Sequence, residues 1–537
     1  MMNGLGKKIY LETFGCQMNV LDSELIEGQL RSLGFDFTTD CDDADVVLYN
    51  TCSVRELAEN KVLSRLGRLK IRKQTDKGLV IGVIGCMAER DGLRMLKRME
   101  HIDLLCGPSE LDKLPSLLNN VLLTGRQQAA LAGDTARRSS TLAAAETDGL
   151  ELLDLSRSFS PEKSRYQAYV RLVRGCNKFC TYCVVPYTRG PEVSRAPDAI
   201  ISEARKLVEA GALEITLLGQ TVNHYAYEES AVSAPGGPVK KVTSFADLLV
   251  RLHDALPQLP RLRFLTSYPA DFGQDILDAM AACPRICRYL HIPAQSGSNR
   301  ILKLMNRGYT VESYLKLLED ARETLPGVAF AGDFIVGFPT ETDADYEQTR
   351  QLLRDARYKN AFIFKYSPRP GTVAIRRFAD DVPDTIKRHR NKDLLMLQNE
   401  ISQELNRSLI GSTVEVLCEG PSGWRGSESV VAGAAVIAQG EQPVELGSRL
   451  AAAIRGQWES SGVTWKAPSG VQLTGRTTAD QIVVFSGSPR LEGQMVRVQV
   501  QAAHGMTIFG SLSPAQSNFN EGIDGPIKSE LVAAVVR

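Results

Sequence analysis

The sequence predicts a multidomain α/β protein of 537 residues with an N-terminal doubly wound α/β domain, a central partial (β/α)6 barrel and a small C-terminal all-β barrel. Three observations support this prediction. Residues 7–122 and 163–395 both alternate apolar, strand-like runs with helical segments. Residues 407–513 instead hold short alternating strands punctuated by glycine. At roughly 100–200 residues per domain, the length suggests about three or four domains.

The first α/β part begins with the strand-like run "KKIYLETFGC" and the helical run "NVLDSELIEGQLRSLGF". Two more strand–helix pairs follow, whose strands are "ADVVLYNTC" and "GLVIGVIGC". Near-continuous apolar runs are typical of parallel strands that are covered by helices on both faces. We therefore expect a doubly wound sheet, in which ligands bind at the carboxyl edge of the strands.

A linker is predicted over residues 123–162, because this stretch lacks clear periodicity. From residue 163, six strand candidates separated by long helical stretches predict a barrel or partial barrel. They are "YQAYVRLVRG", "EITLLGQ", "RLRFLTS", "RYLHIP", "VAFAGDFIVGF" and "AFIFKYS". In such a barrel the chemistry lies at the carboxyl ends of the strands.

The C-terminal strands are interrupted by an insert over about residues 421–470, for which the sequence suggests one helix. Residues 514–537 are expected to form a loose tail. No apolar run approaches the roughly 18 residues of a membrane span, and the N-terminus lacks the apolar stretch of a signal peptide. We therefore expect a cytoplasmic protein that makes no membrane contact.

The formal net charge is zero and the pI is about 7.0, which argues against a globally basic nucleic-acid binder. A local patch would suffice, and residues 61–73 ("KVLSRLGRLKIRK") hold six basic side chains and no acid. The alternative is a solvated helix face. The 11 cysteines favour metal or redox use over disulfides in a reducing compartment.

Cys176, Cys180 and Cys183 form the spacing Cys-x3-Cys-x2-Cys in "RGCNKFCTYC". A 4Fe-4S cluster has four irons that each need a ligand, so three thiolates leave one iron open to a small molecule. At the end of a first barrel strand, this arrangement can chelate the amine and carboxylate of S-adenosylmethionine (SAM). The alternative is structural zinc, which needs a fourth ligand. The sequence offers neither a histidine nor another cysteine nearby.

A second set of cysteines ends the three strands of the first domain. Cys16, Cys52 and Cys86 lie in "TFGC", "NTC" and "IGC". Because the carboxyl ends of adjacent parallel strands meet at one crevice, these thiolates are expected to meet around a second cluster with a second open iron. The alternative is three buried structural cysteines that act as small apolar residues.

These residues resemble the methylthiotransferase branch of the radical SAM enzymes. The resemblance covers residues 7–122, 165–395 and, with an interruption, 407–513. It rests on "TFGCQMNVLDSE", "NTCSVRELAENK", "GVIGCMAER", "GCNKFCTYCVVPYTRGPEVSR", "LLGQTVNHY", "LHIPAQSGSNRILKLMNRGYT" and "DFIVGFPTET". "NTCSVRE" and "CNKFCTYCVVPYTRG" resemble the members of this branch that modify tRNA.

The resemblance implies an auxiliary 4Fe-4S cluster on Cys16, Cys52 and Cys86 and a SAM-binding 4Fe-4S cluster on Cys176, Cys180 and Cys183. It also implies that the C-terminal barrel is a TRAM-like RNA-binding domain. The implied reaction adds a methylthio group to carbon 2 of N6-isopentenyladenosine at position 37 of tRNA. An aromatic C–H bond is too strong for a side-chain base, so a cofactor-derived radical is needed.

The implied partners are the tRNA anticodon loop and an electron donor such as flavodoxin or ferredoxin, and we expect a monomer. The single-stranded loop allows the target base to be splayed out and flipped. One alternative is the same chemistry on another tRNA adenosine derivative or on a ribosomal protein. Another is a non-catalytic iron–sulfur RNA-binding protein. The open cysteine trios argue against it, because a structural cube should close with a fourth protein ligand.

Residues near the expected strand ends are candidates for SAM contact, with a packing or turn role as the alternative for each. They are Gly219, Gln220, Gln295, Ser296, Gly337 and Arg195. Two features depart from the family pattern. The insert splits the TRAM-like domain, and "RFLTSYPADF" carries Tyr268 where relatives often have histidine.

Overall fold

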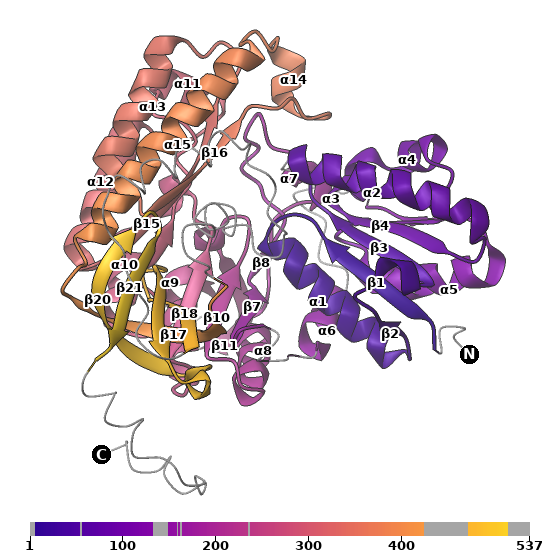
Figure 1. The fold of residues 1–537 in the computed structure, drawn as a ribbon, viewed down its shortest axis with the longest axis horizontal. Coiled ribbons are helices and arrows are strands. Elements are labelled where there is room, and N and C mark those ends of the chain that lie inside the picture. The colour runs from indigo at the N-terminus through magenta and orange to yellow at the C-terminus, as the bar shows by residue number, and fades with distance from the viewer. Residues whose placement is uncertain are drawn as a thin grey trace, which may run out of the picture. The chain divides into compact units, whose positions relative to one another are not determined.

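The computed structural model describes residues 6–53, 56–132, 149–157, 159, 161, 164–234, 237–423 and 471–513. The chain forms two compact units. Unit 1 comprises Met1–Ala356 with Ala361–Leu395, and unit 2 comprises Arg357–Asn360 with Met396–Arg537. Figure 1 labels their elements along the chain.

Unit 1 begins with a six-stranded parallel sheet in the order β2-β1-β3-β4-β5-β6. Its strands are β1 (Lys8–Thr13), β2 (Asp36–Phe37), β3 (Val46–Thr51), β4 (Val80–Gly85), β5 (Leu104–Cys106) and β6 (Gln128–Ala130). The helices beside it are α1 (Gln17–Ser32), α2 (Glu56–Thr75), α3 (Cys86–Asp91), α4 (Leu93–Arg98), α5 (Leu114–Thr124) and α6 (Gly149–Ser156). The strand order reverses between β1 and β3.

Helices cover both faces of this sheet, as predicted. Val46 and Leu48 pack with α1, α5 and α6 on one face. Val47 and Tyr49 pack with α2, α3 and α4 on the other. Successive side chains of a strand point to opposite faces, so a strand buried on both sides is apolar throughout.

The linker prediction for residues 123–162 is wrong in part. β6 adds a sixth strand to the sheet, pairing with β5 in parallel, and α6 packs Leu150 and Leu153 into the core beside α1. Two buried leucines three positions apart are too short a pattern to predict a helix from sequence. Such a short helix is stabilised mainly by packing against the rest of the fold. Residues 133–148 lie outside the described part of the chain.

The second part of unit 1 contains the six predicted parallel strands in chain order. They are β7 (Gln167–Arg171), β10 (Glu214–Leu218), β13 (Arg261–Leu265), β14 (Tyr289–His291), β15 (Ala329–Val336) and β16 (Asn360–Lys365). They form two three-stranded sheets, β13-β10-β7 and β14-β15-β16. A parallel bridge between Leu262 and Ile286 connects the two sheets. The pattern is that of a partial barrel.

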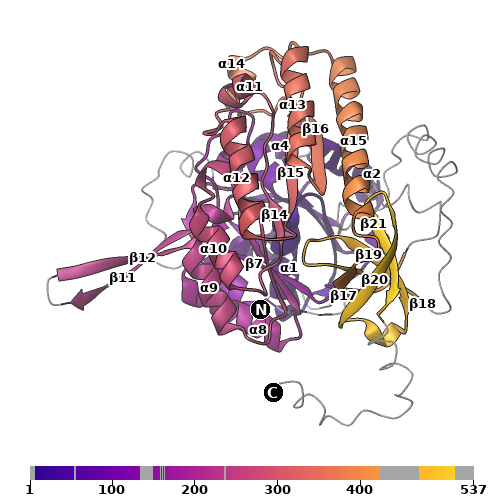
Figure 2. The same cartoon turned by 90° about the vertical axis from the view of Figure 1, so that its left-hand side faces the viewer.

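Helices and a hairpin connect these strands, and α14 (Val373–Arg377) and α15 (Asp384–Arg407) follow the last of them. The connecting helices are α7 (Val185–Thr188), α8 (Pro197–Glu209), α9 (Phe245–Ala255), α10 (Gln274–Ala282), α11 (Asn299–Leu304), α12 (Val311–Thr324) and α13 (Asp343–Ala356). Short β8 (Val173–Arg174) and β9 (Val193–Ser194) pair with each other. Figure 2 shows the hairpin of β11 (Ala226–Ala234) and β12 (Gly237–Ser244) extending outward beside α9.

Unit 2 contains a closed five-stranded barrel in the order β17-β18-β19-β21-β20. Its strands are β17 (Thr413–Pro421), β18 (Val471–Arg476), β19 (Ile482–Gly487), β20 (Met495–His504) and β21 (Thr507–Leu512). Pairing of β17 with β20 closes the barrel around Val416, Phe485 and Val498. The predicted small all-β barrel is confirmed.

The insert joins β17 to β18, two neighbouring antiparallel strands of this barrel. Residues 424–470 of the insert and the tail 514–537 lie outside the described residues. Within the described part of the chain, no helix combines the length and the apolar character that crossing a bilayer requires.

The basic stretch 61–73 forms most of α2, and several of its cations have partners within unit 1. Arg65 pairs with Glu12, and Lys73 pairs with Asp103. Arg72 donates to the Cys41 and Ala44 carbonyl oxygens. Arg68 and Lys70 are exposed. Part of this basic run therefore attaches the helix to the sheet.

Candidate metal centres and active site

Cys16, Cys52 and Cys86 all lie at the carboxyl edge of the first sheet. Cys16 precedes α1, Cys52 follows β3 directly, and Cys86 is the first residue of α3, which follows β4. β1 and β3 flank the point where the strand order reverses, which is where open α/β sheets form a binding crevice. The structure therefore brings the three predicted residues to the expected edge.

Two glycines let these strand ends approach closely. A Cβ on Gly15 would lie 2.5 Å from the Cys52 Cβ, and one on Gly85 would lie 2.6 Å from the Thr51 carbonyl oxygen. Their φ angles are +145° and +88°, which favour glycine. Glycine at positions 15 and 85 is thus needed for these strand ends to lie so close together.

An asparagine pair fixes the first two cysteine loops to each other. The Asn19 Nδ2 donates to the Asn50 Oδ1 at 3.0 Å and to the Thr51 carbonyl at 3.1 Å. Asn50 Nδ2 returns a hydrogen bond to the Asn19 carbonyl at 2.8 Å. The Cys16 Sγ donates to Asn19 Oδ1 at 3.2 Å. Both side-chain amides are buried and hydrogen-bonded, so they hold the two loops in one fixed position relative to each other.

The thiols of this first trio interact electrostatically. A hydrogen bond from Cys52 lowers the pKa of Cys16 to about 6 against the effect of burial, and the Arg189 guanidinium adds to the lowering. Burial raises the pKa of Cys86, and Arg189 opposes it. At Cys16 the balance favours the thiolate, which is the form that binds iron, whereas at Cys86 burial opposes it.

The second trio occupies the loop between β8 and α7. Cys176 and Cys180 are buried, and Cys183 is half-buried. Burial raises the pKa of Cys176 to about 11, and the neighbouring sulfur of Cys180 adds to it. Burial also raises the pKa of Cys183, with contributions from Cys180 and Cys176. The three sulfurs are therefore close enough to affect one another's charge.

Each sulfur of this second trio receives one N–H donor. The Lys178 amide donates to Cys176 Sγ at 3.5 Å, and the Val185 amide donates to Cys183 Sγ at 3.4 Å. The Arg307 Nη1 donates to Cys180 Sγ at 3.3 Å. N–H donors stabilise negatively charged sulfur. Three sulfurs that each accept an N–H hydrogen bond fit a 4Fe-4S cluster with one open iron.

Sequence reasoning missed Arg307, because it lies 127 positions from Cys180. Its guanidinium carbon lies 4.5 Å from the centroid of the Tyr268 ring. Tyr268 had been noted only as a departure from the family. The motif "MNRGYT" was part of the resemblance, but nothing in its spacing indicated a contact with the cysteine loop.

Arg189 connects the two trios. It follows α7, six positions after Cys183, and α7 packs against α3, which begins at Cys86. Its Nη2 donates to Asp22 Oδ2 at 2.7 Å. Burial alone would lower the pKa of Arg189, but Asp22 and the sulfurs of Cys86 and Cys16 raise it well above its usual value. Cys86 and the end of the second cysteine loop therefore adjoin the contact of α3 with α7.

Arg195 does not face the cysteine loop as a free cation. Its fully buried guanidinium contacts Glu151, Glu203 and Asp154 at 2.6, 2.7 and 3.5 Å. Its Nη1 also donates to the Arg171 carbonyl at 2.7 Å. Two of these carboxylates belong to α6, the helix within the expected linker. This arrangement indicates a structural role and argues against the predicted SAM contact.

Gly219 and Gln220 follow β10 at the same edge as the cysteine loop. A Cβ on Gly219 would meet Val222 Cγ1 at 3.2 Å, so the glycine relieves local crowding. Gln220 is half-buried. Their contact with SAM stays a prediction.

Gln295 and Ser296 follow β14. Gln295 has a φ of +71°, and its amide donates to the Asp333 carbonyl at 2.7 Å. Ser296 Oγ lies 3.4 Å from Thr349 Oγ1 and accepts from the Ser298 amide at 3.2 Å. The hydroxyl of Ser296 is thus engaged within the fold, while the strained backbone at Gln295 marks this edge as a candidate site.

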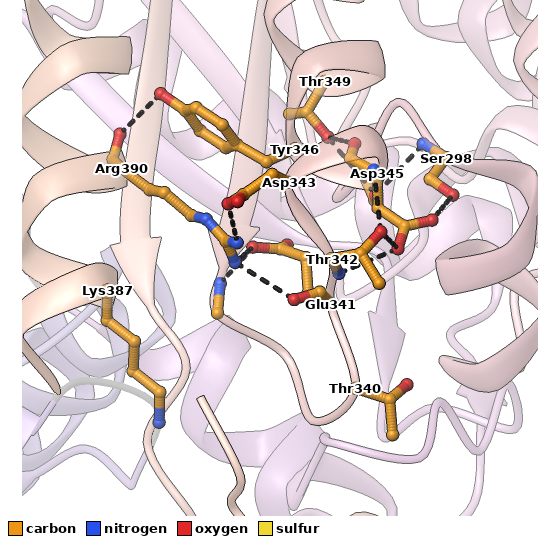
Figure 3. A network of polar contacts seen from close by, with 12 residues as sticks. Ser298, Thr340, Glu341, Thr342, Asp343, Asp345, Tyr346, Thr349, Lys387 and Arg390 are labelled. Carbon is orange, nitrogen blue, oxygen red and sulfur yellow. Dashed lines mark hydrogen bonds and ion pairs between the residues drawn. The ribbon is translucent and has the colours of Figure 1, made fainter. Parts of the chain in front are cut away.

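Gly337 ends β15, where its φ is +69°. A Cβ there would lie 2.3 Å from Lys387 Cγ, so the glycine makes room for α15, and its contact with SAM stays a prediction. Its amide donates to Glu341 Oε1 at 2.8 Å, and Arg390 Nη1 donates to the same oxygen at 2.6 Å. Figure 3 shows Arg390 from α15 reaching into this loop.

All 11 cysteines are free. Across the described residues, no three histidine, cysteine, aspartate or glutamate side chains converge on a point that would hold a single metal ion. A 4Fe-4S cluster on either trio, whose ligands would surround a cube, stays a prediction.

Two stretches of the chain match known families. Residues 8–107 match Uncharacterized protein family UPF0004, and residues 170–353 match the Radical SAM superfamily. The second match contains the cysteine loop, the end of β7 and the barrel strands β10, β13, β14 and β15. With this fold and loop, the chain is a radical SAM protein.

Curated relatives define the family more closely. A protein of Rhodopirellula baltica, named tRNA-2-methylthio-N(6)-dimethylallyladenosine synthase, is 41% identical over 96% of this chain and 97% of the relative. A protein of Protochlamydia amoebophila with the same name is 43% identical over 77% of this chain and 85% of the relative. The chain belongs to the tRNA-2-methylthio-N(6)-dimethylallyladenosine synthase family.

Among solved structures, a radical S-adenosylmethionine methyltransferase from Kitasatospora setae matches with a TM-score of 0.47 and 14% identity. The match covers 76% of each chain. This likeness is too low to support an argument about the site.

Proposed function

We propose that this chain adds a methylthio group to carbon 2 of N6-isopentenyladenosine at position 37 of tRNA. One observation carries the proposal: in a chain of this family, Cys86 of one trio and the end of the loop that carries the other trio adjoin one contact between helices, and Arg189 interacts with the acid and the sulfurs next to it. A reaction that needs both a radical and a sulfur source requires two such sites close together.

Cys176, Cys180 and Cys183 hold a SAM-binding 4Fe-4S cluster in this proposal, and Cys16, Cys52 and Cys86 hold an auxiliary one. With SAM bound, the first cluster supplies a radical able to break an aromatic C–H bond. The protein's own groups stabilise the sulfur charge, through the Lys178 and Val185 amides. Four of the six cysteines, Cys52, Cys86, Cys176 and Cys180, are buried, which limits the access of water to them.

The target base lies in the anticodon loop, where a single-stranded base can be flipped at a cost of a few kcal/mol. The TRAM-like barrel of unit 2 is proposed to bind the RNA. Its strand β20 alternates a buried side with exposed Arg497, Gln499 and Gln501. Arg68 and Lys70 of α2 are further candidates for phosphate contacts, which position RNA without reading sequence.

A low-potential electron donor such as flavodoxin or ferredoxin completes the proposed system. The protein is proposed to act as a monomer in the cytoplasm, where reducing conditions preserve free cysteines.

Mass spectrometry of tRNA nucleosides tests the proposal. The anaerobically reconstituted protein is incubated with SAM, a reductant and tRNA that carries N6-isopentenyladenosine, and the tRNA is then digested. We expect one methylthio group on that nucleoside and none on tRNA that lacks the isopentenyl group. Equal modification of both tRNAs, or of neither, contradicts the proposed substrate. A ribosomal protein fraction serves as the alternative acceptor.

A further inference from the structure

Arg307 is the side chain that reaches the second cysteine trio from another part of the barrel. It follows α11 and places its Nη1 3.3 Å from the Cys180 Sγ. The other two sulfurs receive their donors from backbone amides of their own loop. Cys180 therefore carries the sulfur of this trio that accepts a hydrogen bond from a cationic side chain.

Several contacts fix the Arg307 guanidinium. Its Nε donates to the Tyr309 Oη at 2.8 Å, and its Nη2 donates to the Pro293 carbonyl at 3.0 Å. Its guanidinium carbon lies 4.5 Å from the Tyr268 ring centroid and 5.1 Å from that of Tyr309. Aromatic faces attract a guanidinium. These two hydrogen bonds and two ring contacts hold the N–H group toward the sulfur.

The phenol groups of both tyrosines are fixed in turn. Tyr268 Oη accepts from the Gly308 amide at 2.9 Å, and Tyr309 Oη donates to the Ala294 carbonyl at 2.8 Å. The two rings lie edge to face, with centroids 5.7 Å apart. The support for Arg307 is therefore rigid.

No carboxylate neutralises this cation within the described ranges. Arg189 pairs with Asp22, and Arg195 contacts three acids. Arg307 makes no ion pair with an aspartate or glutamate in the part of the chain that the structure describes. Its full positive charge consequently acts on the nearby sulfur.

We propose that Arg307 raises the reduction potential of the cluster held by Cys176, Cys180 and Cys183, as a positioning and charge-tuning residue. The proposal rests on the proposed function. Reduction moves one electron from a low-potential one-electron donor into the cluster, and this step makes or breaks no bond. Hydrogen bonds to the sulfurs and nearby charge set the potentials of such clusters. A fixed cation beside Cys180 favours the reduced state.

The test compares Arg307→Gln and Arg307→Lys with the unchanged protein. Arg388→Gln is the matched control, because it removes the same charge from an exposed side chain on α15. The full-length holoprotein is titrated with a graded reductant in the absence of SAM and followed by electron paramagnetic resonance. The reduction step of the titration that disappears in the Cys180→Ala variant is assigned to the SAM-binding cluster.

We expect Arg307→Gln to hold about tenfold less reduced cluster than the unchanged protein at the same potential. For a one-electron couple this corresponds to a shift of about 59 mV to more negative potential. Arg307→Lys keeps the charge but loses the planar fork, so its shift should be smaller. Arg388→Gln should leave both reduction potentials unchanged. The potential of the auxiliary cluster should be the same in all variants.

The proposal is overturned if the reduction potential of the SAM-binding cluster is the same in both Arg307 variants as in the unchanged protein. If Arg307→Gln loses iron, Arg307→Met takes its place as the uncharged variant, and a loaded Met variant with an unchanged potential also overturns the proposal. An unchanged step together with weakened SAM binding would make Arg307 a cofactor contact and not a tuning residue. If the unchanged protein shows no Cys180-dependent step, the proposed ligand set fails, and this inference fails with it.

Discussion

Arg189 and Asp22 form a buried ion pair, with 2.7 Å between the Arg189 Nη2 and the Asp22 Oδ2. Asp22 belongs to α1, which begins next to Cys16, and Arg189 follows the loop that carries Cys176, Cys180 and Cys183. The pair thus connects the two segments that carry the cysteine trios. Asp22 also lies 3.4 Å from the Arg171 Nη1, so one carboxylate serves two buried cations.

Asp22→Asn should destabilise unit 1 strongly, because it leaves Arg189 buried without its acid. Removal of one partner of a buried pair costs about 3–5 kcal/mol. Urea unfolding followed by circular dichroism measures the change. The control is Asp384→Asn, whose carboxylate pairs with Lys365 and Arg388 at the surface, where about 0–1 kcal/mol is expected. If both variants lose a similar free energy of unfolding, the buried pair contributes no more to stability than the surface pair.

Cys180→Ala should abolish the cleavage of SAM and leave the auxiliary cluster in place. The alanine variant removes one ligand of the proposed SAM-binding cube, while Cys16, Cys52 and Cys86 are untouched. Chromatography of the products measures 5′-deoxyadenosine after anaerobic reconstitution and reduction. The matched control is Cys418→Ala, since Cys418 lies in the core of the C-terminal barrel. Retained cleavage in the first variant would refute the ligand role of Cys180.

Cys52→Ala should separate the two halves of the chemistry. SAM is still cleaved, because the barrel trio is intact, but no methylthio group reaches the base. Both products are measured in one reaction, 5′-deoxyadenosine by chromatography and the nucleoside by mass spectrometry. A thiolated nucleoside from this variant would contradict the proposed second site.

Asp345 should make the loop after β15 sensitive to acid. Burial alone would raise the pKa of this carboxyl, but Arg300, Ser298 and Thr342 together hold it well below its usual value. A depressed pKa means that its stabilisation is complete above the unfolded value of about 3.9. It is lost as the pH falls toward the folded value. Figure 3 shows the hydroxyl partners around it.

The corresponding variant is Asp345→Asn, which removes the charge and keeps the shape. At pH 7 it should cost about 1–3 kcal/mol, the loss expected for buried hydrogen bonds to a charged group. Urea unfolding at several pH values should show this difference shrinking below about pH 4. A difference that is constant from pH 7 to pH 3 would exclude the ionised carboxylate as its cause.

Local patterns predicted the strands and the positions of both cysteine trios. Apolar runs ending in "TFGC", "NTC" and "IGC" indicated three parallel strands, and parallel strands must bring these ends to one edge. The close-packed glycines at 15 and 85 belong to the same pattern. The closed C-terminal barrel followed from short alternating strands.

Contacts over long sequence distances were beyond the reach of such patterns. Arg189 and Asp22 are 167 positions apart, and Arg307 and Cys180 are 127 apart. Arg195 was predicted to bind SAM because it follows the cysteine loop. Its guanidinium instead donates to the Glu151 carboxylate of α6. The helix α6 itself was missed, since its leucines gain stability only from packing against α1.

The iron content of variants with either cysteine trio replaced tests the central claim most directly. Each cube holds four irons, so the unchanged protein should bind about eight irons per chain after anaerobic reconstitution. Alanine at Cys16, Cys52 and Cys86 should leave about four, and alanine at Cys176, Cys180 and Cys183 should leave the other four. Mössbauer spectra should show intact cubes in both variants. About four irons in the unchanged protein, or no loss on replacing either trio, would contradict the existence of two separate cluster sites.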